Sequence, residues 1–148
     1  MKSLVDHLSQ YAAYHRDPHN IATHFVGIPL IVIAVATLLS RPQWAGVSPA
    51  MLVMVASAIF YLRLELRLGL LMTVLLALSV WLGHTLAGLS TIAWLAWGIG
   101  LFVVGWVFQF VGHYYEGRKP AFIDDVTGLI VGPLFVVVEL GFLLGWRE

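Results

Sequence analysis

Two short stretches of this 148-residue chain concentrate the side chains that could do chemistry. Both combine imidazole groups with amide or carboxylate groups; the residues concerned are His15, Asn20, His24, Gln109, His113 and Glu116. Imidazole is the commonest protein ligand for transition metals, and a carboxylate is either a further ligand or the partner that orients a histidine. The residue types therefore indicate a candidate metal site.

The spacing within each stretch is that of one face of a helix. Asn20 and His24 are four residues apart, and the second set follows an i, i+4, i+7 pattern at Gln109, His113 and Glu116. Residues at these intervals lie above one another on an α-helix. We therefore expect each set to project to one side of its own helix.

Local signals position the two stretches. Asp17 is a favourable N-cap residue and Pro18 is tolerated at the first helical position, so a helix is predicted to begin at Pro18. His15 then approaches from the preceding loop. Gly112, next to the second set, permits close approach of a neighbouring helix.

The candidate ligands are His15, His24 and His113, with Glu116 as a fourth polar group. Together they are enough to hold one metal ion with an open coordination position. The chain has no cysteine, which excludes disulfides, thiolate metal sites and cysteine nucleophiles. Imidazole and carboxylate without thiolate suit Fe(II) or zinc better than copper(I). From the residues alone, the alternative that these histidines are only polar groups at a membrane interface stays open.

Other polar residues are more simply explained. His7, His19 and His84 are interpreted as interfacial or hydrogen-bonding groups rather than ligands. Glu139 follows three valines, and a carboxylate in such surroundings should point into a helical bundle, where it is protonated or paired. For Glu139 a structural and a functional role are both open.

The composition is that of a membrane protein. Hydrophobic residues make up 60% of the chain and charged residues 11%, against roughly 25% charged in a typical soluble domain. The formal net charge is zero, which gives no electrostatic footprint for a nucleic acid partner. We expect an all-α, integral-membrane helical bundle that forms one domain over residues 1–148.

About five transmembrane helices are expected, at roughly 20 residues per span. The apolar segments are residues 21–39, 49–62, 68–89, 91–111 and 126–146. The second and third segments could instead merge into one broken helix. Before the first span, one face of a short amphipathic helix is expected to lie at the membrane interface, and it comprises Leu4, Val5, Leu8, Tyr11 and Ala12. Asp6 interrupts the apolar run that a signal peptide would need, so insertion is expected to use the spans themselves.

Five spans divide the basic residues unequally between the two sides. Six lie on one side, namely Lys2, Arg16, Arg63, Arg67, Arg118 and Lys119, and two lie on the other, namely Arg41 and Arg147. The positive-inside rule predicts that the first side is cytoplasmic. Both polar stretches emerge on that side, so they can meet in space.

The two stretches in combination resemble the signature blocks of the Mpo-type family of integral-membrane 2-hydroxy fatty acid dioxygenases. The resemblance extends over nearly the whole chain. The matching residues are Tyr14-His15, Asn20, His24, Gly27 and Pro29 in the first block and Gln109, Gly112-His113, Glu116 and Pro120-Ala121 in the second. Pro133 and Glu139 match a weaker third block. The fungal member of this family is an endoplasmic-reticulum enzyme of phytosphingosine breakdown.

This resemblance implies an Fe(II)-dependent dioxygenase that uses O₂, without 2-oxoglutarate, to convert 2-hydroxy fatty acids into fatty acids one carbon shorter. It implies that His15, His24 and His113 bind the iron. Asn20, Gln109 and Glu116 are then further ligands or partners of the ligands. The implied location is a bacterial inner membrane, or the endoplasmic reticulum of a eukaryote, with the site on the cytoplasmic side.

Two other functions are compatible with parts of the sequence. A di-iron lipid hydroxylase or desaturase would use more histidines than the six present here. A small transporter or proton relay would need a polar path across the membrane, and residues 91–108 offer almost no polar side chain before Gln109.

Overall fold

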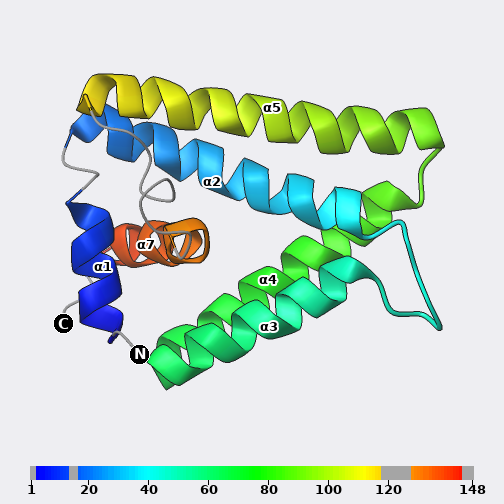
Figure 1. Cartoon of the computed structure of the whole chain (residues 1–148), viewed down its shortest axis with the longest axis horizontal. Helices are drawn as coiled ribbons and strands as arrows, with labels where there is room; N and C mark the ends of the chain where they lie inside the picture. Colours follow the sequence, from blue (N-terminus) through cyan, green and yellow to red (C-terminus); the bar gives the residue numbers. More distant parts are fainter. Residues whose placement is uncertain (1–2, 14–16, 118–127, 145–148) are drawn as a thin grey trace. The chain divides into compact units, whose positions relative to one another are not determined.

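A computed structural model describes residues 3–13, 17–117 and 128–144, and these residues form six α-helices (Figure 1). The helices are α1 (Leu4–Ala12), α2 (Pro18–Leu39), α3 (Pro49–Leu64), α4 (Leu66–Ala87), α5 (Thr91–Glu116) and α7 (Gly128–Leu143). The prediction of an all-α chain is confirmed. Each predicted apolar segment corresponds to one of these helices, because long apolar runs without helix breakers satisfy their backbone hydrogen bonds internally.

Three helices are long and apolar enough to cross a membrane, namely α2, α4 and α5. Two further apolar helices of the described chain are shorter, α3 with 16 residues and the segment Ile130–Phe142 within α7. A 16-residue helix is about 24 Å long, somewhat less than the hydrocarbon thickness of about 30 Å. The structure thus supports a membrane bundle, with three of the five expected spans at full length.

Exposed apolar side chains form a continuous stripe on α4. Leu70, Val74, Leu78 and Trp81 are all exposed, and their spacing places them on one face of the helix. In water such a stripe would be an unfavourable apolar patch. In a bilayer the same stripe faces the hydrocarbon, as the composition predicts.

Helices α3 and α4 form a helical hairpin (Figure 1). The helical run stops at Glu65, whose side chain accepts a hydrogen bond from the backbone N–H of Leu68 (2.5 Å) and so caps α4. Gly69 allows the two backbones to approach, because a Cβ atom there would lie 2.6 Å from Cα of Leu62. Residues 49–89 are therefore two packed helices rather than one broken span.

The chain divides into two compact units. The first unit comprises residues 1–29 and 105–148, and the second comprises residues 30–104. Helices α2 and α5 each contribute one part to each unit. A single domain over the whole chain stays a prediction.

In the first unit, α1 packs against α7 (Figure 1). Tyr11 contacts Phe135, with ring centroids 4.9 Å apart, and Leu8 packs against the same cluster. Burial in this cluster raises the pKa of the Tyr11 hydroxyl. The predicted apolar face of α1 is confirmed for Leu8, Tyr11 and Ala12, which are covered by another helix of the protein. Val5, predicted on the same face, is instead 69% exposed.

In the second unit, α5 packs against the end of α2. The indole N–H of Trp94 donates a hydrogen bond to the carbonyl of Thr37 (2.8 Å). The guanidinium of Arg41 lies 4.9 Å from the centre of the Trp94 ring and donates to the hydroxyl of Thr91 (3.1 Å). These contacts join the last turn of α2 and the residue Arg41 that follows it to the first turn of α5.

Candidate metal centre

Helix α2 begins at Pro18, as predicted from Asp17-Pro18. The carboxylate of Asp17 accepts a hydrogen bond from the backbone N–H of His19 (2.8 Å), and the carbonyl of Asp17 accepts one from Ile21 (3.0 Å). Asp17 is therefore the N-cap residue. This cap fixes the first turn of the helix that carries Asn20 and His24.

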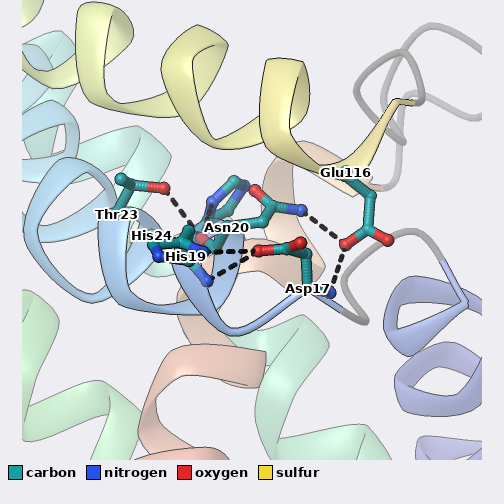
Figure 2. A network of polar contacts seen from close by, with 6 residues as sticks. All are labelled: Asp17, His19, Asn20, Thr23, His24 and Glu116. Carbon is teal, nitrogen blue, oxygen red and sulfur yellow. Dashed lines mark hydrogen bonds and ion pairs between the residues drawn. The ribbon is translucent and has the colours of Figure 1, made fainter.

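The imidazole of His24 is fully buried and oriented by its own helix. Its Nδ1 atom lies 2.8 Å from the carbonyl oxygen of Asn20, which also accepts a hydrogen bond from the hydroxyl of Thr23 (2.8 Å) (Figure 2). A carbonyl can only accept, so Nδ1 must carry the proton in this hydrogen bond. The lone pair of a neutral ring is then on Nε2, the arrangement of a metal-binding histidine.

Helix α5 continues beyond the predicted apolar segment, which ends at residue 111, and reaches Glu116, as the spacing of the polar residues predicted. The extension puts Gln109, His113 and Glu116 on one continuous helix. Gln109 is 7% exposed and His113 is 6% exposed, so both side chains are buried in the first unit. The apolar pattern ends before the helix does because polar residues in its last turns are buried against other helices.

The two described candidate ligands lie next to each other. The ring centroids of His24 and His113 are 4.9 Å apart, and the ring planes are nearly perpendicular at 82°. The two residues come from different helices. The prediction that the two polar stretches meet in space is thus fulfilled by these two imidazoles.

Glu116 reaches from the end of α5 to the start of α2. Its Oε1 atom accepts hydrogen bonds from the backbone N–H of Asp17 (2.8 Å) and from the side-chain amide of Asn20 (3.1 Å) (Figure 2). The sequence indicated Glu116 and Asn20 as further ligands or as partners of the histidine ligands, and it gave Asp17 only the role of a helix cap. The contact of Asp17 with Glu116 was therefore not predicted. The signal that points to it is that the N–H groups at the start of any helix need acceptors from outside that helix.

Two glycines allow the close approach of α2 and α5 on either side of the histidines. A Cβ atom at Gly112 would collide with the Thr23 hydroxyl and lie 2.5 Å from Oδ1 of Asn20. A Cβ atom at Gly27 would lie 2.8 Å from the carbonyl of Gly105. The predicted role of Gly112 is therefore confirmed.

The Gln109 amide packs against α2. Its Oε1 atom would lie 2.9 Å from a Cβ atom at Gly27, and within the described part of the chain this oxygen has no hydrogen-bond partner. No described contact joins Gln109 to either histidine, so its role as a partner of the ligands stays a prediction.

His15, the third candidate ligand, lies outside the described residues. Within residues 3–13, 17–117 and 128–144, no group of three or more His, Asp or Glu side chains is arranged to hold a metal ion. The described chain thus supplies two imidazoles, and a complete site requires a further ligand. The role of His15 as a ligand stays a prediction.

The remaining histidines divide into exposed and buried ones. The His19 side chain is 71% exposed, pairs with Asp17 (3.2 Å) and stacks on Tyr115. His84 contacts Gln43 (3.4 Å) in the second unit. Both agree with their interpretation as ordinary polar residues. His7, in contrast, is buried, which its interpretation as an interfacial residue did not anticipate.

Glu139 is half-buried on α7. It makes no hydrogen bond or ion pair with the residues that the structure describes. The predicted pairing of this carboxylate is therefore not found in that part of the chain, and its role is open.

Comparison with known proteins assigns the family. A family model described as "2-hydroxy-palmitic acid dioxygenase Mpo1-like" matches residues 1–144. The chain belongs to the Mpo1-like family. The 2-hydroxy-palmitic acid dioxygenase MPO1 of Saccharomyces cerevisiae is 36% identical over 151 residues, an alignment that covers 98% of this chain and 85% of the yeast protein. No solved structure matches the chain. The resemblance indicated by the two sequence blocks is thus confirmed for this Mpo1-like protein.

Proposed function

We propose that this Mpo1-like protein is a membrane-embedded, Fe(II)-dependent dioxygenase that converts 2-hydroxy fatty acids into fatty acids one carbon shorter. The yeast relative is named a 2-hydroxy-palmitic acid dioxygenase, and its substrate is a 2-hydroxy fatty acid. The observation that carries the proposal is the buried pair His24 and His113, with Nδ1 of His24 bound to a carbonyl. A protein with only structural interfacial histidines has no need of this arrangement.

The donor groups suit iron. His24 and His113 would bind the metal ion through imidazole nitrogens, with His15 as the proposed third ligand. Imidazoles without thiolate suit Fe(II), and a site with three protein ligands leaves coordination positions open. Bound iron would activate O₂ and accept the carboxylate and hydroxyl oxygens of the substrate.

The protein itself excludes water and positions the substrate. His24 and Asn20 are both completely buried, and the glycine contacts at Gly27 and Gly112 bring α2 and α5 close together. A dry pocket protects a reactive centre from side reactions. On α5, Val107 and Phe110 are exposed within two turns of His113, so the acyl chain can approach from the bilayer.

The proposed reaction needs no second organic reductant. With one O₂, the C1–C2 bond breaks, C1 leaves as CO₂, C2 becomes the new carboxyl carbon, and one water is formed. The four electrons that reduce O₂ all come from the substrate. This balance agrees with a reaction that does not use 2-oxoglutarate.

The test is a reconstitution of the purified protein in detergent. Fe(II) is added without oxygen, and O₂ consumption is then followed with 2-hydroxypalmitate, with palmitate as the control that lacks only the hydroxyl. We expect O₂ uptake and a 15-carbon fatty acid with the hydroxy acid alone. Bound iron of about one per chain is expected, since two would favour a di-iron enzyme. No O₂ uptake and no shortened product would refute the proposal.

We also propose that the site lies on the cytoplasmic side, because six of the eight basic residues are predicted to lie there. Single cysteines at Arg118 and Arg147 should react with an impermeant reagent from opposite sides of the membrane. Labelling of both from one side would contradict this topology.

A further inference from the structure

We propose that Glu116 is a positioning residue that caps α2 from the end of α5 and, through Asn20, fixes the orientation of the His24 imidazole. The structural part of this inference depends only on the contacts of Glu116. Its consequence for iron affinity rests on the proposed function.

The first step concerns the N-terminus of α2. In a capping box, the side chain three residues after the N-cap accepts a hydrogen bond from the N-cap backbone N–H. Helix α1 has such a box, in which the Asp6 carboxylate accepts from the N–H of Ser3 (3.3 Å). In α2 the corresponding residue is Asn20, and the N–H of Asp17 is accepted by Glu116 instead. Glu116 therefore takes the place of the missing acidic residue from another helix.

The second step connects Glu116 to His24. Asn20 links the two residues, since its side-chain amide donates to Glu116 (3.1 Å) and its carbonyl accepts from Nδ1 of His24 (2.8 Å). Hydrogen bonds to a carboxylate are stronger than those between neutral groups. By holding both Asp17 and Asn20, Glu116 fixes the turn whose carbonyl selects the His24 tautomer.

The third step separates positioning from metal binding. Two hydrogen bonds join Oε1 of Glu116 to the first turn of α2, where a negative charge also interacts favourably with the helix dipole. Nδ1 of His24 is bound to the carbonyl of Asn20. Glu116 thus has the contacts of a residue that orients a metal ligand. Residues of this kind are expected to change the metal affinity without binding the metal themselves.

The first experiment uses the metal-free protein, so that it is independent of any iron chemistry. Nitrogen NMR of ¹⁵N-histidine-labelled protein reports which His24 nitrogen carries the proton, with His24→Ala to assign the signal. We expect only the Nδ1–H form in the unchanged protein and a mixture of both tautomers in Glu116→Ala. Glu116→Gln keeps an oxygen acceptor and should largely restore the single tautomer.

The matched control is Glu65→Gln. Glu65 also caps a helix with its carboxylate, but it caps α4 in the second unit. Glu65→Gln should leave the His24 signal unchanged. An unchanged single tautomer in Glu116→Ala would overturn the proposal. If that variant does not fold, Glu116→Asp, whose carboxylate is one methylene shorter, replaces it, and an unchanged single tautomer in Glu116→Asp would overturn the proposal instead.

The second experiment titrates Fe(II) alone into each variant without oxygen. We expect the dissociation constant to rise about 10–100-fold in Glu116→Ala at unchanged stoichiometry, as for other residues that orient a metal ligand. X-ray absorption should show the same number of protein ligands. Loss of one ligand would make Glu116 a ligand and overturn the positioning role. If the unchanged protein binds no iron, the proposed function fails, while the tautomer measurement still decides the role of Glu116.

Discussion

The two parts of α2 both bury polar side chains, but they satisfy them differently. In the second unit, Thr37 donates a hydrogen bond to the carbonyl of Ile33 (2.8 Å), and Ser40 donates to the carbonyl of Ala36 (2.5 Å). Both partners lie four residues earlier on the same helix. In the first unit, the Asn20 side chain donates to Glu116, which is 96 residues away in the sequence.

This difference distinguishes buried polar side chains that only stabilise their own helix from those that belong to a candidate site. A buried hydroxyl that bonds back to its own helix is satisfied wherever the helix lies, so it needs no second helix. An amide or imidazole has more polar atoms than one carbonyl can satisfy. Such groups require partners from other elements or from a ligand. Of the buried side chains of Asn20, Thr37 and Ser40, only that of Asn20 therefore depends on a partner from another helix, and the following predictions test that contrast.

The largest effect is expected from the two imidazoles. His24→Ala and His113→Ala should each weaken Fe(II) binding more than about 100-fold, beyond the effect of losing an orienting partner, and should abolish O₂ uptake. The measurement is bound iron after anaerobic dialysis. His84→Ala, in the second unit, and His19→Ala, on the exposed start of α2, should retain iron. Equal loss in all four variants would show that these ligands are wrongly chosen.

The next effect concerns helix packing. Gly112→Ala introduces a Cβ atom against Thr23 and Asn20, and Gly83→Ala introduces one 2.6 Å from the carbonyl carbon of Ala36. Overpacking of this kind typically costs about 1–3 kcal/mol, so thermal unfolding in detergent should show both variants destabilised. Only Gly112→Ala should also weaken Fe(II) binding. If both variants weakened Fe(II) binding equally, the proposed functional difference between the two units would be contradicted.

A smaller contrast tests the buried polar side chains directly. Asn20→Ala removes a hydrogen bond to the Glu116 carboxylate, and a hydrogen bond to a charged group contributes about 1.5–3 kcal/mol. Thr37→Val removes a hydroxyl and keeps the shape of the side chain, so its cost should be nearer the net value of one hydrogen bond, about 1 kcal/mol. Chemical unfolding measures both. A larger loss in Thr37→Val would contradict the view that its hydroxyl is satisfied locally.

The smallest effect is expected at Gly100 on α5, where a Cβ atom would meet no other atom within 4 Å. Alanine stabilises a helix interior relative to glycine by roughly 0.5–1 kcal/mol. Gly100→Ala should therefore keep or slightly raise the unfolding temperature and leave iron binding unchanged. Destabilisation would reveal a protein contact at this position.

Much of the local structure follows from the sequence. Asp17-Pro18 predicted the start of α2, because cap chemistry depends on neighbouring residues alone. The spacing of Gln109, His113 and Glu116 predicted a shared helix because the α-helical repeat is fixed by the backbone. Hydropathy alone gave an apolar segment that ends at residue 111, and only the spacing of the polar residues indicated that the helix continues to Glu116.

The sequence by itself determined that this is an all-helical membrane protein of the Mpo1-like family with its chemistry-bearing side chains in two stretches. Hydropathy, caps and periodicity are properties of neighbouring residues. Only the tertiary structure decided that His24 meets His113, that Glu116 reaches Asp17 and Asn20, and that α1 packs on α7. Those contacts join distant residues, so they depend on how helices approach one another, which no local pattern specifies.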